Sequence, residues 1–115
     1  MTTPDLVDQF EAYSLEQDQA WLYDEQRKIN RIFDVLRTIS DELKSRPGDE
    51  RRALAQLYDH PNMQVRLNAV KSSLAVEPVE GRRQLQLIAE SGDYPAAGEA
   101  GMSIRNLEEG IFVPK

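Results

Sequence analysis

The hydrophobic and polar positions of this chain follow helical rather than strand spacing. No stretch sustains the alternation that marks a half-buried strand, and no Asn-Gly or Asp-Gly turn joins two apolar runs. The clearest stripe has apolar side chains three and four positions apart, at Ile29, Ile32, Phe33, Leu36, Ile39 and Leu43. This spacing predicts an amphipathic helix of about five turns with the stripe facing the core.

Turn signals divide the rest of the chain into further helices. Pro4 behind Thr3 is typical of a first-turn proline after an N-cap residue. A helical stripe follows, interrupted by polar residues 16–19, at Leu6, Phe10, Tyr13, Ala20 and Trp21. Arg46-Pro47-Gly48-Asp49 ends the second helix, because proline disfavours helical geometry in the preceding residue. Shorter helices are predicted up to Tyr58, from Met63 to about Ala75, up to Ser91-Gly92, and from about Pro95 to Leu107.

The helix that begins near Met63 is apolar on two sides. Val65 and Ala69 lie on one line, whereas Leu67, Val70 and Leu74 lie on another. A helix apolar over so wide an arc is expected to sit between neighbours. Asn62, at the end of the turn Asp59-His60-Pro61-Asn62, is placed to cap it.

The last predicted helix contains two glycines, Gly98 and Gly101, each costing about 1 kcal/mol relative to alanine. Close approach of another backbone is the interpretation we favour, and a flexible hinge is the alternative.

The turn followed by Val65-Arg66-x-x-Ala69, after Leu54-x-x-Leu57, resembles the second helix of a HEAT repeat. The resemblance implies antiparallel helices around the turn, Val65 and Ala69 facing the stack, and Arg66 bracing neighbouring repeats. Ser73 departs from the pattern, which has an apolar residue there. Asp59-x-Pro61 and Asp93-x-Pro95, 34 positions apart, give a faint repeat that points to stacked hairpins.

The wider run from Glu42 to Pro95 resembles a small bacterial family of uncharacterised single-domain HEAT-like proteins, which offers no activity to carry over. We therefore expect an all-α, HEAT-like alpha-alpha superhelix of about six helices in stacked antiparallel hairpins. Residues 1–115 would form one domain, with an N-terminal helix pair at 1–46, HEAT-like hairpins at 49–109 and a tail at 110–115.

Charge is distributed unevenly along the chain, whose net charge is −6. Residues 1–26 contain seven acids and no Lys or Arg, whereas the rest of the chain is nearly balanced. A solvated helix face that keeps the protein soluble is the simpler interpretation. The sharper one is an acidic surface that docks a basic partner. Its candidate partner-binding residues are Asp5, Asp8, Glu11, Glu16 and Asp18.

Catalytic and cofactor signals are sparse. The chain has no cysteine and one histidine, His60, in a turn. It lacks paired metal-ligand spacings and glycine-rich phosphate loops. We therefore expect no catalysis, no cofactor and no metal site. Nucleic-acid binding is an alternative for the basic helix starts, although a net charge of −6 opposes it. These basic residues are Arg27, Lys28, Arg31, Arg51, Arg52, Arg82 and Arg83.

Aromatic residues near the acidic segment, Tyr13, Trp21 and Tyr23, are expected at the edge of the core, with an exposed binding patch as the alternative. The N-terminus lacks a secretory pattern, and no apolar run approaches the roughly 18 residues of a bilayer-spanning helix. We expect a cytoplasmic protein-protein interaction module that uses the acidic helix or the concave face of the stack. One version is an inhibitor or immunity-type protein; a nucleic-acid binder or an enzyme with an unrecognised site is the alternative.

Overall fold

The structure, a computed structural model, describes residues 1–115 and is entirely helical. It consists of α1 (Thr3–Leu22), α2 (Gln26–Ser45), the 3-10 helix η1 (Glu50–Leu57), α3 (Met63–Ser73), α4 (Pro78–Glu90) and α5 (Ala96–Glu108). The predicted all-α fold of six helices is therefore confirmed. None of these helices combines the length and apolar character needed to span a bilayer.

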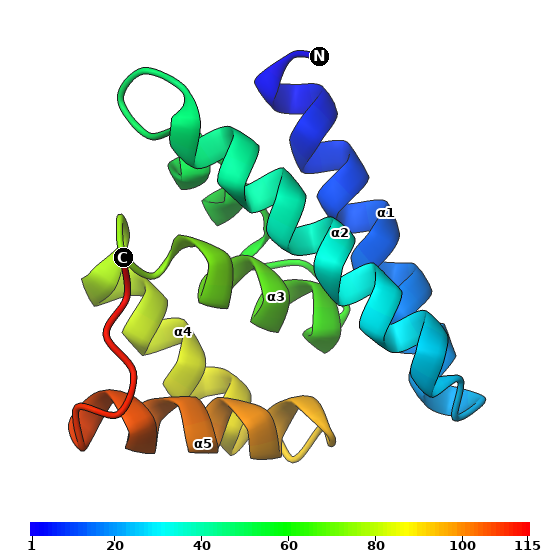
Figure 1. Cartoon of the computed structure of the whole chain (residues 1–115). Coiled ribbons are helices and arrows are strands. Elements are labelled where there is room, and N and C mark those ends of the chain that lie inside the picture. Colours follow the sequence, from blue (N-terminus) through cyan, green and yellow to red (C-terminus); the bar gives the residue numbers. More distant parts are fainter.

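The helices are stacked in three layers (Figure 1). α1 and α2 pack side by side, η1 and α3 form the middle layer, and α4 packs against α5. Beyond α5 the chain turns back, and its C-terminus lies near the connection between α3 and α4. The middle layer thus contacts both outer helix pairs.

The first helix pair differs from the sequence prediction in two details. Thr2, not Thr3, caps α1: its hydroxyl accepts from the Asp5 backbone N–H and the Asp5 carboxylate accepts from the Thr2 N–H, each at 3.2 Å. In α2 the stripe is buried as predicted except for Phe33, which is 55% exposed. Phe33 is next to Ile32 in sequence and so lies about 100° around the helix from that buried side chain.

α3 occupies the centre of the stack, as its two apolar sides predicted. Val65, Leu67, Ala69 and Val70 are all fully buried, and the helix contacts every other helix. Asn62 caps its N-terminus, with Oδ1 accepting from the backbone N–H groups of residues 64 and 65 at 2.9 and 3.1 Å. The burial of both apolar sides places α3 between its neighbours, as the sequence predicted.

The prediction of close backbone contact at Gly98 and Gly101 is wrong. A Cβ at Gly101 would meet nothing within 4 Å, and one at Gly98 would meet only the Tyr94 ring at an ordinary 3.5 Å. α5 runs through both residues without interruption. The close approach lies instead in α4, where a Cβ at the buried Gly81 would stand 2.7 Å from Leu74 Cδ1. Glycine at that position allows α4 to pack against the end of α3.

Candidate functional site

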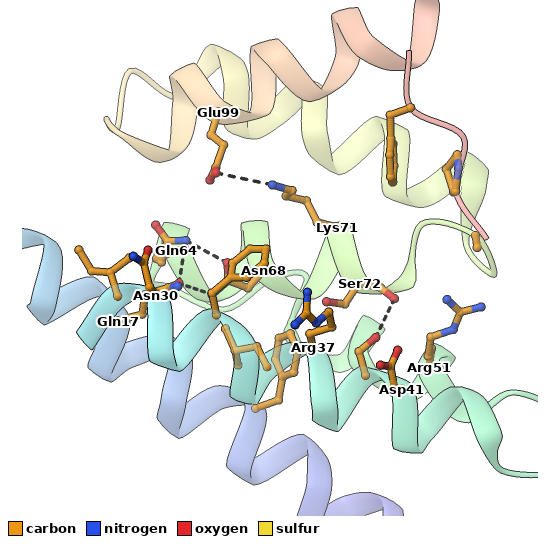
Figure 2. Close-up of a pocket in the computed structure, with 18 of the residues that line it drawn as sticks. Gln17, Asn30, Arg37, Asp41, Arg51, Gln64, Asn68, Lys71, Ser72 and Glu99 are labelled. Atoms are coloured by element: carbon orange, nitrogen blue, oxygen red, sulfur yellow. Dashed lines mark hydrogen bonds and ion pairs between the residues drawn. The ribbon is translucent and has the colours of Figure 1, made fainter. Parts of the chain in front are cut away.

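A groove of about 570 Å³ opens between α2 and α3. We call it the α2–α3 groove. Its α2 wall consists of side chains at helical spacing, namely Gln26, Ile29, Asn30, Phe33, Leu36, Arg37, Ser40 and Asp41. Its α3 wall repeats that spacing with Gln64, Asn68, Lys71 and Ser72, and Ala75 follows just after the helix. The groove is completed by side chains of α1, by Arg51 of η1, by Glu99 of α5 and by the C-terminal tail (Figure 2).

Three aromatic side chains line this groove and are substantially exposed. Trp21 is 40% exposed, Phe33 55% and Phe112 46%. The prediction that Trp21 and Tyr23 belong to the core edge is wrong, since Tyr23 is also largely exposed, whereas Tyr13 does pack against the core. Trp21 and Phe33 line the groove from α1 and α2 and keep much of their surface open to solvent. The groove is thus a hollow surface with apolar side chains open to solvent.

A cluster of hydrogen-bonded amides forms part of the groove wall (Figure 2). Asn68 Nδ2 donates to Gln17 Oε1 at 2.9 Å and to Ser14 Oγ at 3.1 Å. Gln64 Nε2 donates to Asn68 Oδ1 at 2.9 Å and to Gln17 Oε1 at 3.4 Å. Because Ser14, Gln17 and Gln64 are buried, this cluster fixes α1 against α3 through directional bonds.

This cluster was not predicted from the sequence. Gln17 belongs to the polar stretch that interrupts the apolar stripe of α1, and the structure shows that this residue faces α3. The available signal was the three-residue spacing of Ser14 and Gln17, which places two uncharged polar residues on one face of α1.

Four basic side chains line the groove: Arg37, Arg51, Lys71 and Lys115. Lys71 Nζ lies 3.6 Å from Glu99 Oε1, and Arg37 Nη2 lies 3.1 Å from Asp34 Oδ1. Both pairs are solvent-exposed, so they contribute little stability. These two cations can therefore exchange partners at low cost.

Arg51 has a different role because its side chain is buried. Its Nε and Nη2 donate to the two Asp49 carboxylate oxygens at 2.9 and 2.6 Å, and Nη2 also reaches the Lys115 backbone oxygen at 3.4 Å. The hydrogen bonds from Arg51 lower the pKa of Asp49, and those to Asp49 raise the pKa of Arg51. Arg51 thus holds its own loop and the C-terminal tail.

The carboxylates predicted to bind a partner are distributed along α1. Asp5 belongs to the helix cap, where the Thr2 hydrogen bonds lower its pKa. Glu16 Oε1 lies 3.5 Å from Lys28 Nζ on the neighbouring helix. Asp8 is exposed and makes no hydrogen bond or ion pair with another side chain. None of the five residues lines the α2–α3 groove.

Glu11 and Asp18, the other two candidate partner-binding carboxylates, contact the turn before α3. Glu11 Oε2 lies 2.8 Å from His60 Nε2, while His60 Nδ1 accepts the Asn62 backbone N–H at 3.0 Å. Asp18 Oδ2 accepts from Asn62 Nδ2 at 3.0 Å. Asn62 therefore caps α3 with its oxygen and binds α1 with its nitrogen.

Arg66 joins the middle layer to the third. Its Nη2 donates to Gln84 Oε1 of α4 at 3.1 Å, while its buried Nε has no partner. The remaining basic residues considered for nucleic-acid binding are spread over different helices, and several pair with acids. These pairs are Lys28 with Glu16, Arg52 with Glu77, Arg82 with Glu108, and Arg83 with Glu80.

No three His, Asp or Glu side chains are grouped so that they could hold a metal ion. The fold and the site together define a stack of helices with an amide-lined and aromatic-lined groove between α2 and α3.

Comparison with known proteins then places the chain in a family. Residues 4–108 match the family described as Domain of unknown function (DUF2019), and the chain belongs to that family. It is also similar to the protein RPA1889 from Rhodopseudomonas palustris CGA009, whose crystal structure matches with a TM-score of 0.97 at 50% sequence identity. That match covers 100% of this chain and 95% of that chain. The comparison with curated proteins found no match.

Proposed function

We propose that this protein is a non-catalytic protein-binding module that holds a segment of a partner protein in the α2–α3 groove. The observation that supports the proposal is the gathering of Trp21, Phe33 and Phe112, each 40–55% exposed, along one hollow surface. Aromatic side chains dominate the binding energy of protein interfaces, and burying their apolar surface is favourable. The exposed Asn30 amide on the groove wall, which is bonded to Gln26, would offer hydrogen-bonding groups to a bound backbone.

A HEAT-like architecture is part of this proposal. η1 with α3 and α4 with α5 would be the two stacked hairpins, preceded by the α1–α2 pair. Stacked helical hairpins build extended concave surfaces that serve in binding. The α2–α3 groove corresponds to such a surface, because α3 is the inner helix of the first hairpin and α2 belongs to the preceding pair.

The acidic face of α1 is the weaker candidate for the binding surface. An inhibitor or immunity-type protein would use it to dock a basic partner. Of its five candidate carboxylates, only Asp8 makes no hydrogen bond or ion pair within the chain. Asp5 accepts from the Thr2 backbone N–H, and Glu11, Glu16 and Asp18 bond to side chains outside α1. Recruiting these last three would break contacts that join α1 to the rest of the stack.

The experiment selects binders from a displayed random-peptide library on the wild-type protein. The affinities of synthetic copies are then measured by isothermal titration on wild type, Phe33→Ala and Leu87→Ala. Leu87 is the matched control, since it is 44% exposed on α4 and lies outside the groove. Phe33→Ala should weaken binding about tenfold or more, as loss of an aromatic anchor does, and Leu87→Ala should not.

A charge reversal on the acidic face of α1 tests the competing binding surface. The variant Asp8→Lys should bind the selected peptides as wild type does. Peptides that bind Phe33→Ala as tightly as wild type, but lose affinity for Asp8→Lys, would overturn the groove in favour of the acidic face.

A further inference from the structure

The length of the α2–α3 groove indicates a chain segment as its occupant. Its lining residues extend along α2 from Gln26 to Asp41. At 1.5 Å per residue this stretch measures roughly 22 Å. An extended segment of about six residues would span that length. The groove is therefore too elongated to be filled by a compact small molecule of one ring.

The chemistry of the groove changes along its length. Gln17, Asn30 and Gln64 lie at one end in Figure 2, and Arg51 and Asp41 lie at the other. Arg37 and Lys71 lie between these ends and come from opposite walls. Phe33 is on the α2 wall one turn before Arg37. An apolar residue held over Phe33 would thus place its neighbour close to two cations.

The groove is electrostatically unlike the rest of the molecule. Apart from Arg51, which Asp49 neutralises, three basic side chains line it against two acidic ones, Asp41 and Glu99, an excess of one basic side chain. The whole chain has the opposite balance, with 14 bases and 20 acids. Such local complementarity selects partners of opposite charge. Arg51 is committed to Asp49 and the tail, so Arg37, Lys71 and Lys115 carry this preference.

We infer that the groove recognises an acidic segment with an apolar or aromatic anchor, in which a carboxylate binds between Arg37 and Lys71. This inference rests on the proposed protein-binding function and adds the chemistry of the partner. The exposed Lys71–Glu99 and Arg37–Asp34 pairs would be exchanged for the ligand carboxylate. The anchor would cover Phe33 and Trp21.

The test uses peptides selected on the wild-type protein, together with copies in which each Asp or Glu is replaced by Asn or Gln. Affinities are measured for wild type, Arg37→Glu and Arg83→Glu. Arg83 is a matched control, because it is an exposed arginine paired with an acid three residues earlier, as Arg37 is, and lies outside the groove. We expect selected peptides to be rich in acids, and both the amide copies and Arg37→Glu to lose about tenfold in affinity.

Reversing the charges of both the peptide and Arg37 distinguishes direct recognition of the peptide from a structural effect of the substitution. A peptide whose acids are replaced by lysine should bind Arg37→Glu better than wild type. Neutral or basic selected peptides that still require Phe33 would overturn the acidic partner while leaving the proposed function intact. Binding that is insensitive to Phe33→Ala would overturn both. Tighter binding of a labelled oligouridine than of any peptide, lost in Phe33→Ala and Arg37→Glu, would replace the peptide with a single-stranded nucleic acid.

Discussion

The hydroxyl oxygens of Tyr58 and Ser73 lie 2.5 Å apart in the core between η1 and α3. Ser73 Oγ also donates to the Ala69 carbonyl at 2.6 Å. Because a serine hydroxyl has a single proton, Tyr58 must be the donor in the bond between the two side chains. This bond explains how the core tolerates a fully buried serine at position 73.

The direction of this hydrogen bond predicts unequal effects of its removal. Ser73→Ala leaves the buried Tyr58 hydroxyl without an acceptor and should lower the free energy of unfolding by about 1–3 kcal/mol. Tyr58→Phe leaves Ser73 bonded to Ala69 and should cost less, about 0.5–1.5 kcal/mol. Urea unfolding of both variants and the double variant provides the measurement. A larger loss in Tyr58→Phe than in Ser73→Ala would contradict the assigned donor.

Stability at alkaline pH should depend on the same tyrosine. Burial, partly opposed by the Ser73 hydrogen bond, raises the pKa of Tyr58 above its ordinary value of about 10. The unfolded chain then releases the Tyr58 proton at lower pH than the folded chain does. The stability that the protonated Tyr58 hydroxyl contributes is therefore complete below about pH 10 and is lost as the pH rises above it. Relative to Tyr58→Phe, wild type should lose unfolding free energy as the pH rises above about 10. Parallel pH profiles for the two proteins would exclude this linkage.

Periodicity and turn chemistry were sufficient to predict the helices. The three-and-four spacing of α2 and the Pro-Gly break after Arg46 depend only on local geometry, and α3 was correctly placed between neighbours because both of its sides are apolar. The cap of α1 was displaced by one residue because Thr2 and Thr3 are chemically alike.

The groove was beyond sequence reasoning for a different physical reason. Phe33 belongs to the apolar stripe by spacing, and its exposure depends on where α3 and the tail leave space. The amide cluster joins Gln17 to Asn68, which are distant in sequence. The spacing of Ser14 and Gln17 marks a polar face of α1 but does not identify its partner on α3. The glycine in close contact was also misplaced, because helix spacing depends on tertiary packing.

Replacing Gly101 and Gly81 by alanine should change the free energy of unfolding in opposite directions. Gly101→Ala adds a methyl group in open space and should stabilise the protein by about 0.5–1 kcal/mol through helix propensity. Gly81→Ala forces the buried Leu74 side chain to move and should destabilise it by about 1–3 kcal/mol. Thermal unfolding checks both, and a stabilising Gly81→Ala would show that Leu74 repacks freely.

Disruption of the amide cluster should loosen α1 from α3. Asn68→Ala removes the donor to Ser14 and Gln17 and the acceptor of Gln64, so we expect a loss of about 1–3 kcal/mol in unfolding free energy. Asn30→Ala is the control, since Asn30 is exposed and bonds only to Gln26. Equal losses in the two variants, measured in urea, would argue against a structural role of the cluster.

The position of the C-terminal tail affects how the protein should be handled. Phe112, Pro114 and Lys115 form part of the groove, whereas the N-terminus emerges from the far end of α1 (Figure 1). An affinity tag or biosensor anchor fused after Lys115 would stand at the groove entrance and crowd an incoming peptide. Attachment through Met1 leaves that entrance clear, so a comparison of the two immobilised forms would reveal false negatives in a binding screen.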